Sequence, residues 1–111
     1  MRISKNDRLF NVYSAASTPN AEGYQTVIYT KAIDSMGGDL QPIGSKIDPA
    51  MYGINSNPAD VKQLFFNTDN MVSLGYFIDD LTDGVTYLVK GLHVWYSHKE
   101  AILEPIEVII P

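Results

Sequence analysis

Cysteine is absent from this chain of 111 residues, and long apolar runs are absent as well. Without thiols the protein has no disulfides, zinc–thiolate centres or cysteine nucleophiles, a composition that fits a reducing compartment. No apolar segment approaches the ~18–20 residues of a membrane-spanning helix. Residues 1–10 also lack the apolar core of a signal peptide. We therefore expect a soluble, cytoplasmic protein that makes no membrane contact.

Positive charge is scarce. Eight lysines and arginines stand against 13 acidic residues, which gives a formal net charge of -5. This balance argues against free-standing nucleic-acid binding, because such binding depends mainly on cationic contacts to phosphate. Three of the cations, Arg2, Lys5 and Arg8, lie in the first eight positions. Residues 1–7 are interpreted as an N-terminal arm, either a solvated leader or a segment that reaches an acidic partner.

Recognisable catalytic and metal-binding sets are also missing. His93 and His98 are the only histidines, and their spacing across a strand end is poor for a shared metal. The Asp79, Asp80 and Asp83 cluster lacks the ligand pattern of a calcium loop and is predicted to be a solvated turn. The serines lack a Gly-x-Ser-x-Gly elbow. We expect no enzymatic activity, no cofactor and no metal.

The residues that are present favour β structure. Hydrophobic residues make up 45% of the chain, enough for one domain with its own core. Residues 9–14 and 24–30 are predicted strands because they are rich in β-branched and aromatic side chains. The small, polar segment 15–23 between them predicts a hairpin with a long tip.

The middle of the chain is predicted to be irregular. Paired glycines make residues 34–39 the clearest loop of the first half, and residues 34–59 are interpreted as one long irregular connection. Residues 61–66 fit either a helix that starts near Asn57-Pro58 or a short strand. We favour the strand because of the β character of the surrounding sequence.

Two long β runs close the chain, at residues 85–96 and 101–110. The Asp83-Gly84 pair that precedes them is a typical signal for a turn between antiparallel strands. Large apolar side chains occur on both faces of the first run, which predicts a central or interface-forming strand. Pro105 predicts that the last strand is bent, bulged or at an edge.

The expected fold is therefore mainly β, a small antiparallel β-barrel or sandwich with long loops and at most one short helix. Five aromatic residues of the second half resemble the stacking platform of single-strand-binding barrels: Tyr76, Phe77, Tyr87, Trp95 and Tyr96. Only Lys90 and Lys99 lie near them. Core and subunit-contact roles are therefore preferred over a platform for a peptide or single-stranded nucleic acid.

Three segments of the chain form a recognisable pattern: Glu22-Gly23-Tyr24 leading into a Tyr/Val/Ile strand, Lys62-Gln63-Leu64-Phe65-Phe66 before a polar break, and the run from Asp83-Gly84-Val85 through His93-Val94-Trp95-Tyr96 to a closing strand. Together they resemble the small head-completion proteins of long-tailed bacteriophages, also called head–tail connector, stopper or minor capsid proteins. The resemblance is a pattern of strands over residues 8–106. Residues 33–59 correspond less well and lack the helix that some relatives carry there.

The resemblance implies a structural virion protein that forms a ring at the head–tail junction. Such a ring would extend the portal channel, help retain packaged DNA and dock the tail. Its implied partners are copies of itself, a portal or adaptor protein and a tail-side protein, while DNA passes through without sequence-specific binding. The implied locations are the host cytoplasm during assembly and then the neck of the virion.

The side chains expected at subunit contacts are mostly basic or aromatic: Arg2, Lys5, Arg8, Tyr24, Met36, Tyr52, Trp95 and Tyr96. The segments 15–23 and 34–59 are expected to reach neighbouring subunits or the portal. Trp95 is expected to be largely buried, or covered by a neighbouring subunit.

Overall fold

The computed structural model describes residues 8–19, 21–44, 47–54 and 57–107. These residues form six strands: β1 (Arg8–Pro19), β2 (Gln25–Pro42), β3 (Lys62–Phe66), β4 (Phe77–Asp80), β5 (Thr86–Val94) and β6 (Lys99–Ile106). Two short 3₁₀ turns, η1 (Pro49–Tyr52) and η2 (Pro58–Asp60), lie between β2 and β3. The prediction of a mainly β fold is confirmed.

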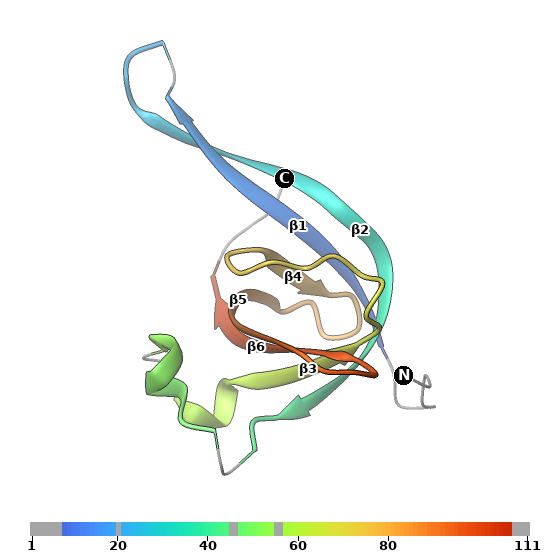
Figure 1. Cartoon of the computed structure of the whole chain (residues 1–111). Helices are drawn as coiled ribbons and strands as arrows, with labels where there is room; N and C mark the ends of the chain where they lie inside the picture. The colour runs from blue at the N-terminus through green and yellow to red at the C-terminus, as the bar shows by residue number, and fades with distance from the viewer. Residues whose placement is uncertain (1–7, 20, 45–46, 55–56, 108–111) are drawn as a thin grey trace.

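The strands form one closed antiparallel sheet, in the order β1-β2-β3-β6-β5-β4 (Figure 1). Closure comes from the pairing of β1 with β4, in which Phe10 lies opposite Asp80 and Tyr13 opposite Phe77. Of the two predicted architectures, the structure is therefore the barrel. Closing a sheet removes its exposed edges wherever strands have neighbours on both sides.

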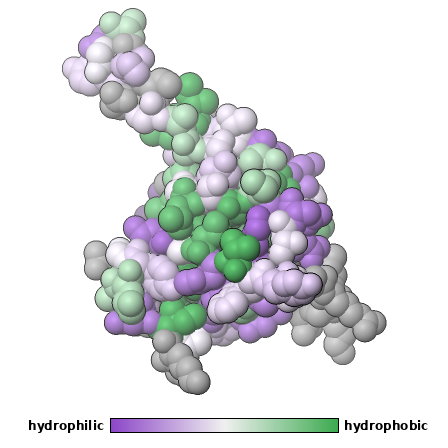
Figure 2. Space-filling view, viewed as in Figure 1, coloured by the Kyte–Doolittle hydropathy of each residue, from purple (hydrophilic) through white to green (hydrophobic). Residues whose placement is uncertain are grey.

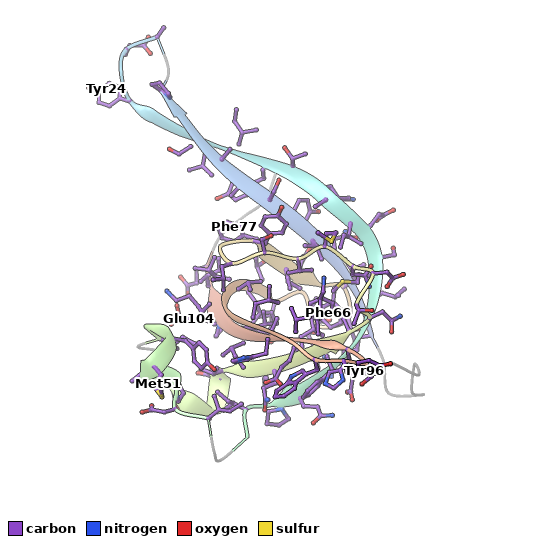
Figure 3. All side chains as sticks on the ribbon, viewed as in Figure 1. Tyr24, Met51, Phe66, Phe77, Tyr96 and Glu104 are labelled. Atoms are coloured by element: carbon purple, nitrogen blue, oxygen red, sulfur yellow. The ribbon has the colours of Figure 1, made fainter. Side chains whose placement is uncertain are left out.

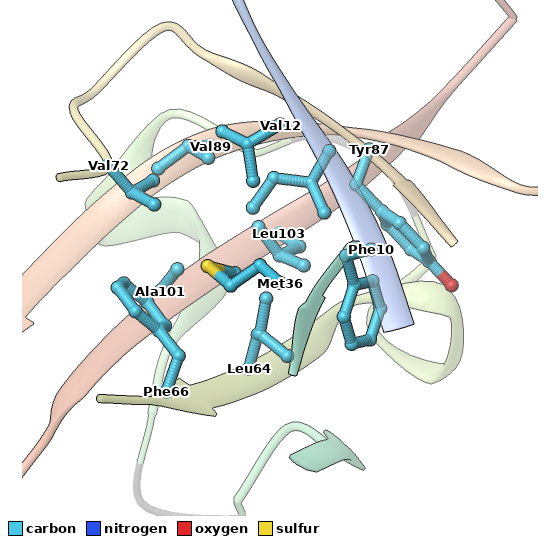
Figure 4. Close-up of a cluster of buried hydrophobic side chains, with 11 residues drawn as sticks. Phe10, Val12, Met36, Leu64, Phe66, Val72, Tyr87, Val89, Ala101 and Leu103 are labelled. Carbon is cyan, nitrogen blue, oxygen red and sulfur yellow. The ribbon is translucent and has the colours of Figure 1, made fainter. Parts of the chain in front are cut away.

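The core fills the inside of this barrel (Figure 4). Its buried hydrophobic residues are Phe10, Val12, Met36, Leu64, Phe66, Val72, Ile78, Tyr87, Val89, Ala101 and Leu103. They come from all six strands and from the segment before β4. In β5, Tyr87 and Val89 are buried while Thr86 and Leu88 are less so, as the period of two in a strand requires.

The expected loop at residues 34–39 is wrong, because β2 runs without a break from Gln25 to Pro42. Met36 lies in the core, and Gly38 faces inward beside Leu64. A Cβ atom on Gly38 would lie 2.8 Å from Leu64 Cδ1 and 3.1 Å from the Phe65 carbonyl oxygen. The glycine thus permits close packing inside the barrel, and the irregular connection begins only after Pro42.

The described parts of the connection between β2 and β3 (43–44, 47–54 and 57–61) cover part of the outside of the barrel. Ile54, Val61 and Ile102 form a second buried cluster there, with Tyr52 packed against it. A Cβ atom on Gly91 would lie 2.5 Å from the Tyr52 ring, so this glycine makes room for the tyrosine. No helix in the described part of the chain is long and apolar enough to cross a membrane.

The favoured strand at residues 61–66 is confirmed, and the alternative helix is wrong beyond one short turn. The Asn57 side chain accepts a hydrogen bond from the Ala59 amide at 3.1 Å, as a helix cap does, but the turn η2 ends at Asp60. The strand β3 then begins at Lys62 and pairs with both β2 and β6.

The predicted turn at Asp83-Gly84 is confirmed between β4 and β5, with Gly84 at φ 72°. The strand β5 is central, as predicted, because it pairs with β4 and β6. β6 pairs with β3 only from Lys99 to Leu103. Pro105 therefore lies where one side of β6 has lost its neighbour in β3, and a residue without an amide hydrogen is tolerated there.

Candidate assembly surface

The longest feature of the molecule is a two-stranded ribbon, the part of β1 and β2 that lies beyond the barrel (Figure 1). The two strands pair from Arg8 opposite Gly38 to Pro19 opposite Gln25. Only Phe10–Tyr13 of β1 pair with β4, and only Asp39–Pro42 of β2 pair with β3. The projection makes the molecule elongated, with extents of 47 × 29 × 27 Å.

The ribbon leaves the barrel at a bend. The β1–β2 register shifts between Phe10 and Val12 and again between Val12 and Tyr13. Ser35 adopts a left-handed conformation with φ 57°, and its amide donates a hydrogen bond to Asn11 Oδ1 at 3.1 Å. Such irregularities bend a strand and increase its twist. They direct the ribbon away from the barrel.

Aromatic contacts hold the base of the ribbon in place. Tyr29 packs edge-on against Phe77 of β4, with 5.2 Å between ring centroids. Lys31 Nζ lies 5.9 Å from the centre of the Tyr13 ring and 3.7 Å from the Asp34 carboxylate. These contacts fix the first part of the ribbon, so that its outer part projects in a defined direction.

The outer part of the ribbon exposes apolar side chains. Val27 is 49% exposed and Ile28 50%, and the two lie on opposite faces because they are consecutive in a strand. Figure 2 shows strongly hydrophobic side chains on the projection and a larger hydrophobic patch at its base. An isolated two-stranded ribbon is at best marginally stable in water, and exposed apolar area of this kind marks contact surfaces.

A second exposed apolar group lies at the far end of the molecule. Tyr96 and the ribbon-tip residue Tyr24 are labelled at opposite ends in Figure 3. Val94 is 68% exposed, Trp95 52% and Tyr96 fully exposed. The expectation that Trp95 is largely buried is therefore wrong for the single chain, because it lies at the end of β5, where the barrel wall stops. Its covering by a neighbouring subunit stays a prediction.

The Trp95 ring is held in place although it is exposed. Its Nε1 donates a hydrogen bond to Glu100 Oε2 at 3.2 Å, and Gln63 Nε2 donates to Glu100 Oε1 at 2.7 Å. His93 and His98 lie beside the indole, with ring centroids 6.3 and 6.4 Å away. The side chain thus has little freedom left to lose when a partner binds, a property of interface anchors.

The single tryptophan permits a direct test of this exposure. We expect its fluorescence in the isolated chain to be quenched readily by acrylamide, because about half of the side chain is exposed. Trp95→Ala should lower the free energy of unfolding by about 1 kcal/mol, well below the ~3–5 kcal/mol typical of a buried tryptophan. Urea titration measures that change. Emission shielded from acrylamide in the isolated chain would contradict the placement.

The five aromatic residues considered as a stacking platform do not lie together. Tyr87 is buried in the core, whereas Phe77 packs under the ribbon and Trp95 lies near the β5–β6 turn. Lys99, one of the two nearby cations, donates a hydrogen bond from Nζ to the Asn70 carbonyl oxygen at 2.9 Å. The described residues therefore offer no single aromatic platform flanked by available cations.

The carboxylates of the β4–β5 turn form an ion-pair cluster with β1. Arg8 Nη1 lies 2.9 Å from Asp80 Oδ2 and 2.5 Å from Asp83 Oδ2. Asp80 is fully buried and also accepts a hydrogen bond from the Thr82 amide at 2.9 Å. The prediction of a solvated turn is thus wrong for Asp80. Its charge is compensated by Arg8, and the pair ties the turn to the first strand.

This cluster perturbs the ionisation of its neighbours. Hydrogen bonds to Asp83 and then Asp80 raise the pKa of the Arg8 guanidinium. Burial, followed by the charges of Asp80 and Asp83, raises the pKa of the Tyr87 phenol. The uncharged phenol is thus favoured in the folded state.

Alkaline titration should reveal Tyr87. A raised folded-state pKa means that its contribution to stability is complete below the ordinary tyrosine value of about 10 and is lost as the pH rises through the folded value. We expect tyrosine absorbance to show a phenol that ionises above the ordinary tyrosine value of about 10. Tyr87→Phe should remove that late step, and a titration curve that keeps the step in this variant would contradict its assignment to Tyr87.

The structure separates the residues expected at subunit contacts. Arg2 and Lys5 lie outside the described residues, and Arg8 is committed to the ion-pair cluster. Met36 is 3% exposed, so it belongs to the core and is dropped from the contact set. The core placement follows from the strand that replaces the expected loop.

The remaining expected contact residues lie on the surface or close to it. Tyr24 is 72% exposed at the ribbon tip, while Trp95 and Tyr96 lie at the opposite end. Tyr52 is half-buried, and its hydroxyl is 2.6 Å from His93 Nε2. Sequence reasoning missed Val27 and Ile28, although the absence of proline between Pro19 and Pro42 is a signal compatible with a long strand.

Comparison with known proteins identifies the same fold in solved structures. The chain is similar to protein SF1141 from Shigella flexneri 2a, with 10% identity, a TM-score of 0.66 and coverage of 95% of this chain and 96% of that one. It is also similar to the phage-like element PBSX protein xkdH from Bacillus subtilis, with 13% identity, a TM-score of 0.58 and coverage of 91% and 95%. No protein-family model and no curated protein sequence matches the chain.

Proposed function

We propose that this protein is a structural component of a tailed-phage particle, one that forms a ring at the head–tail junction. In that position it would extend the portal channel, help to retain packaged DNA and dock the tail. The fold shared with a protein of a phage-like element, over 91% of this chain and 95% of that one, supports the phage assignment. The role is structural and requires neither a catalytic group nor a cofactor.

The observation that carries the proposal is the projecting ribbon. Val27 and Ile28 are about half-exposed on a segment that neither β3 nor β4 covers. A single chain gains little by ordering such a segment, because a two-stranded ribbon buries little apolar area by itself. A neighbouring subunit would supply the missing contact area. The ribbon therefore suits a protein that works in an assembly.

The charge of the chain is compatible with a channel for DNA. A wall that gripped phosphates would slow the passage of DNA, whereas a subunit with net charge -5 offers few such contacts. The two exposed ends provide separate surfaces for the portal or adaptor protein on one side and the tail-side protein on the other. Electron microscopy of the virion, which tests the ring, also tests which end contacts which partner.

A binding module for a peptide or single-stranded nucleic acid is the alternative function, and the exposed Trp95 and Tyr96 favour it. A titration with single-stranded oligonucleotides at increasing salt separates the two functions. Phosphate-driven binding weakens steeply with salt, whereas a structural ring protein should show no such binding at any salt concentration.

Electron microscopy of the virion tests the main proposal. Particles that carry a labelled version of this protein should show the label in a ring at the neck, and particles made without it should lose DNA or lack tails. Complete, infectious particles that contain none of the protein would overturn the proposal. The comparison uses a phage from which the gene is deleted, grown with and without a second copy of the gene supplied in trans.

A further inference from the structure

The ribbon has two outer edges that no described strand covers. On one side, β3 pairs with β2 only from Asp39 onward. Among the described strands, the segment from Gln25 to Gly38 therefore pairs only with β1. On the other side, β4 pairs with β1 only as far as Tyr13. Backbone amide and carbonyl groups along such edges are available as a template for another strand.

These edges also lack the usual protection against pairing. Soluble proteins guard exposed edges with charged side chains, prolines or bulges. Beyond Tyr13, β1 carries no charged residue, and its only proline is Pro19 at the end. From Gln25 to Gly38, β2 carries only Lys31 and Asp34 as charges, and these two lie 3.7 Å apart. The outer half of the ribbon is therefore open to strand addition on both sides.

We propose that the ribbons of neighbouring copies of this chain pair edge to edge, the outer edge of β1 in one copy with the outer edge of β2 in the next. This contact rests on the proposed function, because it takes the ring as the closed form of the assembly. It names the segment that joins the subunits and the kind of contact, a continuous antiparallel ladder.

Strand direction explains why the contact joins unlike edges. Within one ribbon β1 and β2 run in opposite directions. When neighbouring ribbons point the same way, β1 of one copy lies antiparallel to β2 of the next, and the existing ladder simply continues. Each copy then retains one β1 edge and one β2 edge for its two neighbours. Such a head-to-tail contact propagates until rotation closes it into a ring.

Pairing of like edges gives a different assembly. Two β1 edges in antiparallel alignment place the ribbons in opposite directions, and this symmetric contact joins two copies and leaves both β2 edges unpaired. The side chains favour unlike edges. Small residues on β1, such as Ala15 and Ala16, would lie beside the larger Val27 and Ile28 of β2. Close cross-strand packing of this kind stabilises a sheet, whereas the small side chains of two β1 strands would offer each other little contact area.

Disulfide trapping between single-cysteine variants tests the contact, and the chain contains no cysteine that would interfere. Ala15→Cys and Val27→Cys lie on the same face of the ribbon, and Ala16→Cys and Ile28→Cys lie on the other. For each face, the β1 variant and the β2 variant are mixed in equal amounts, and one of the two carries a tag that changes its size. The mixture of full-length, folded proteins is then oxidised. The control is Ser73→Cys, at an exposed site that belongs to neither β1 nor β2.

We expect disulfides between the β1 variant and the β2 variant to exceed those between like variants, with little cross-linking of Ser73→Cys. A majority of like-with-like disulfides, or cross-linking no greater than in the control, would overturn the inference. Pairing of the ribbon with a strand of a different virion protein would give this second result.

Charge insertion provides a second, independent measurement. The double variant Val27→Lys/Ile28→Lys should lose self-association in sedimentation experiments, because lysines on an edge strand oppose pairing. The matched variant Met71→Lys/Leu74→Lys places the same charges at exposed apolar sites outside the ribbon and should associate like the unaltered chain. Equal association of both variants would overturn the inference.

The two proposals fail in distinguishable ways. If the label forms a ring at the neck but the ribbons do not cross-link, the edge pairing is wrong and the proposed function stands. If the ribbons cross-link but the protein is absent from particles, the proposed function is wrong and the edge pairing stands. Circular dichroism of each variant confirms that the barrel is folded in every comparison.

Discussion

Replacing residues 16–28 by Asn-Gly is expected to abolish assembly while leaving the barrel folded. The replacement connects Ala15 to Tyr29 through two residues. Ala15 and Tyr29 lie opposite each other in the ladder, and Asn-Gly is the preferred sequence for a two-residue hairpin turn. The contact between Tyr29 and Phe77 at the base of the ribbon is kept. Only the outer part of the ribbon is removed.

The barrel should tolerate this change because none of the core residues is lost. The buried residues of β1 and β2, namely Phe10, Val12 and Met36, all precede or follow the replaced segment. The free energy of unfolding is expected to change by less than about 1 kcal/mol, since the segment buries little and its loss shortens the loop. Urea titration followed by circular dichroism measures this quantity.

Complementation of a phage that lacks the gene measures the effect on assembly. The shortened protein should be present in the infected cell, folded, and absent from particles, so that infectious particles fall to the level seen without the gene. The control for a change elsewhere on the surface replaces Met71, Ser73 and Leu74 by glycine or serine. Val72 is kept because it is buried. Normal particle yield with the shortened ribbon would contradict its proposed role.

Phe66→Ala is expected to have the largest effect on stability, a loss of about 3–5 kcal/mol. Phe66 is fully buried inside the barrel, in the strand that links β2 to β6. Removal of the ring eliminates its apolar contacts and leaves a cavity that the surrounding sheet cannot fill. Because small domains are stable by about 5–15 kcal/mol, the variant should unfold at a far lower urea concentration or fail to accumulate.

The adjacent residue supplies a matched control. Phe65 has the same side chain but lies on the outer face of β3, half-buried beside His98, with 5.7 Å between ring centroids. Phe65→Ala should cost on the order of 1 kcal/mol. Equal losses for the two variants would contradict the register of β3, because a shift of one residue exchanges the two faces of a strand.

The strand content of the second half was predictable from local sequence. Asp83-Gly84 signals a turn that the structure contains, and the alternating run after it becomes the central strand β5. Pro105 predicts a weakened strand position, and it lies where β6 has no pairing with β3. These features depend on the backbone preferences of a few adjacent residues, so they can be read without knowledge of the fold.

The path of β2 could not be predicted in the same way. Gly37 and Gly38 are typical of a loop when only their neighbours in sequence are considered. In the barrel, Gly38 lies under Leu64 and Phe65, where a side chain would clash. The need for a residue without a Cβ atom comes from a strand more than twenty positions away. No local pattern contains that information.

The burial of Trp95 and of Asp80 could not be predicted from local sequence either. Trp95 is more exposed than its neighbours in sequence suggest, and Asp80 is more buried. An aromatic residue in an apolar run is expected inside, yet Trp95 lies past the end of the barrel wall and is half-exposed. An aspartate in a polar turn is expected outside, yet Asp80 is buried because Arg8 reaches it from the start of the chain. Burial depends on which distant segments close over a residue.

The sequence by itself determined an acidic, cysteine-free chain that is rich in β structure, because composition, turn residues and side-chain alternation act locally. Only the tertiary structure decided that the sheet closes into a barrel, that β1 and β2 continue beyond it as a ribbon, and that Val27 and Ile28 are exposed there. Closure depends on pairing between β1 and β4, strands far apart in the chain. The length of the ribbon is set by where β3 and β4 stop pairing, which no property of residues 15–30 records.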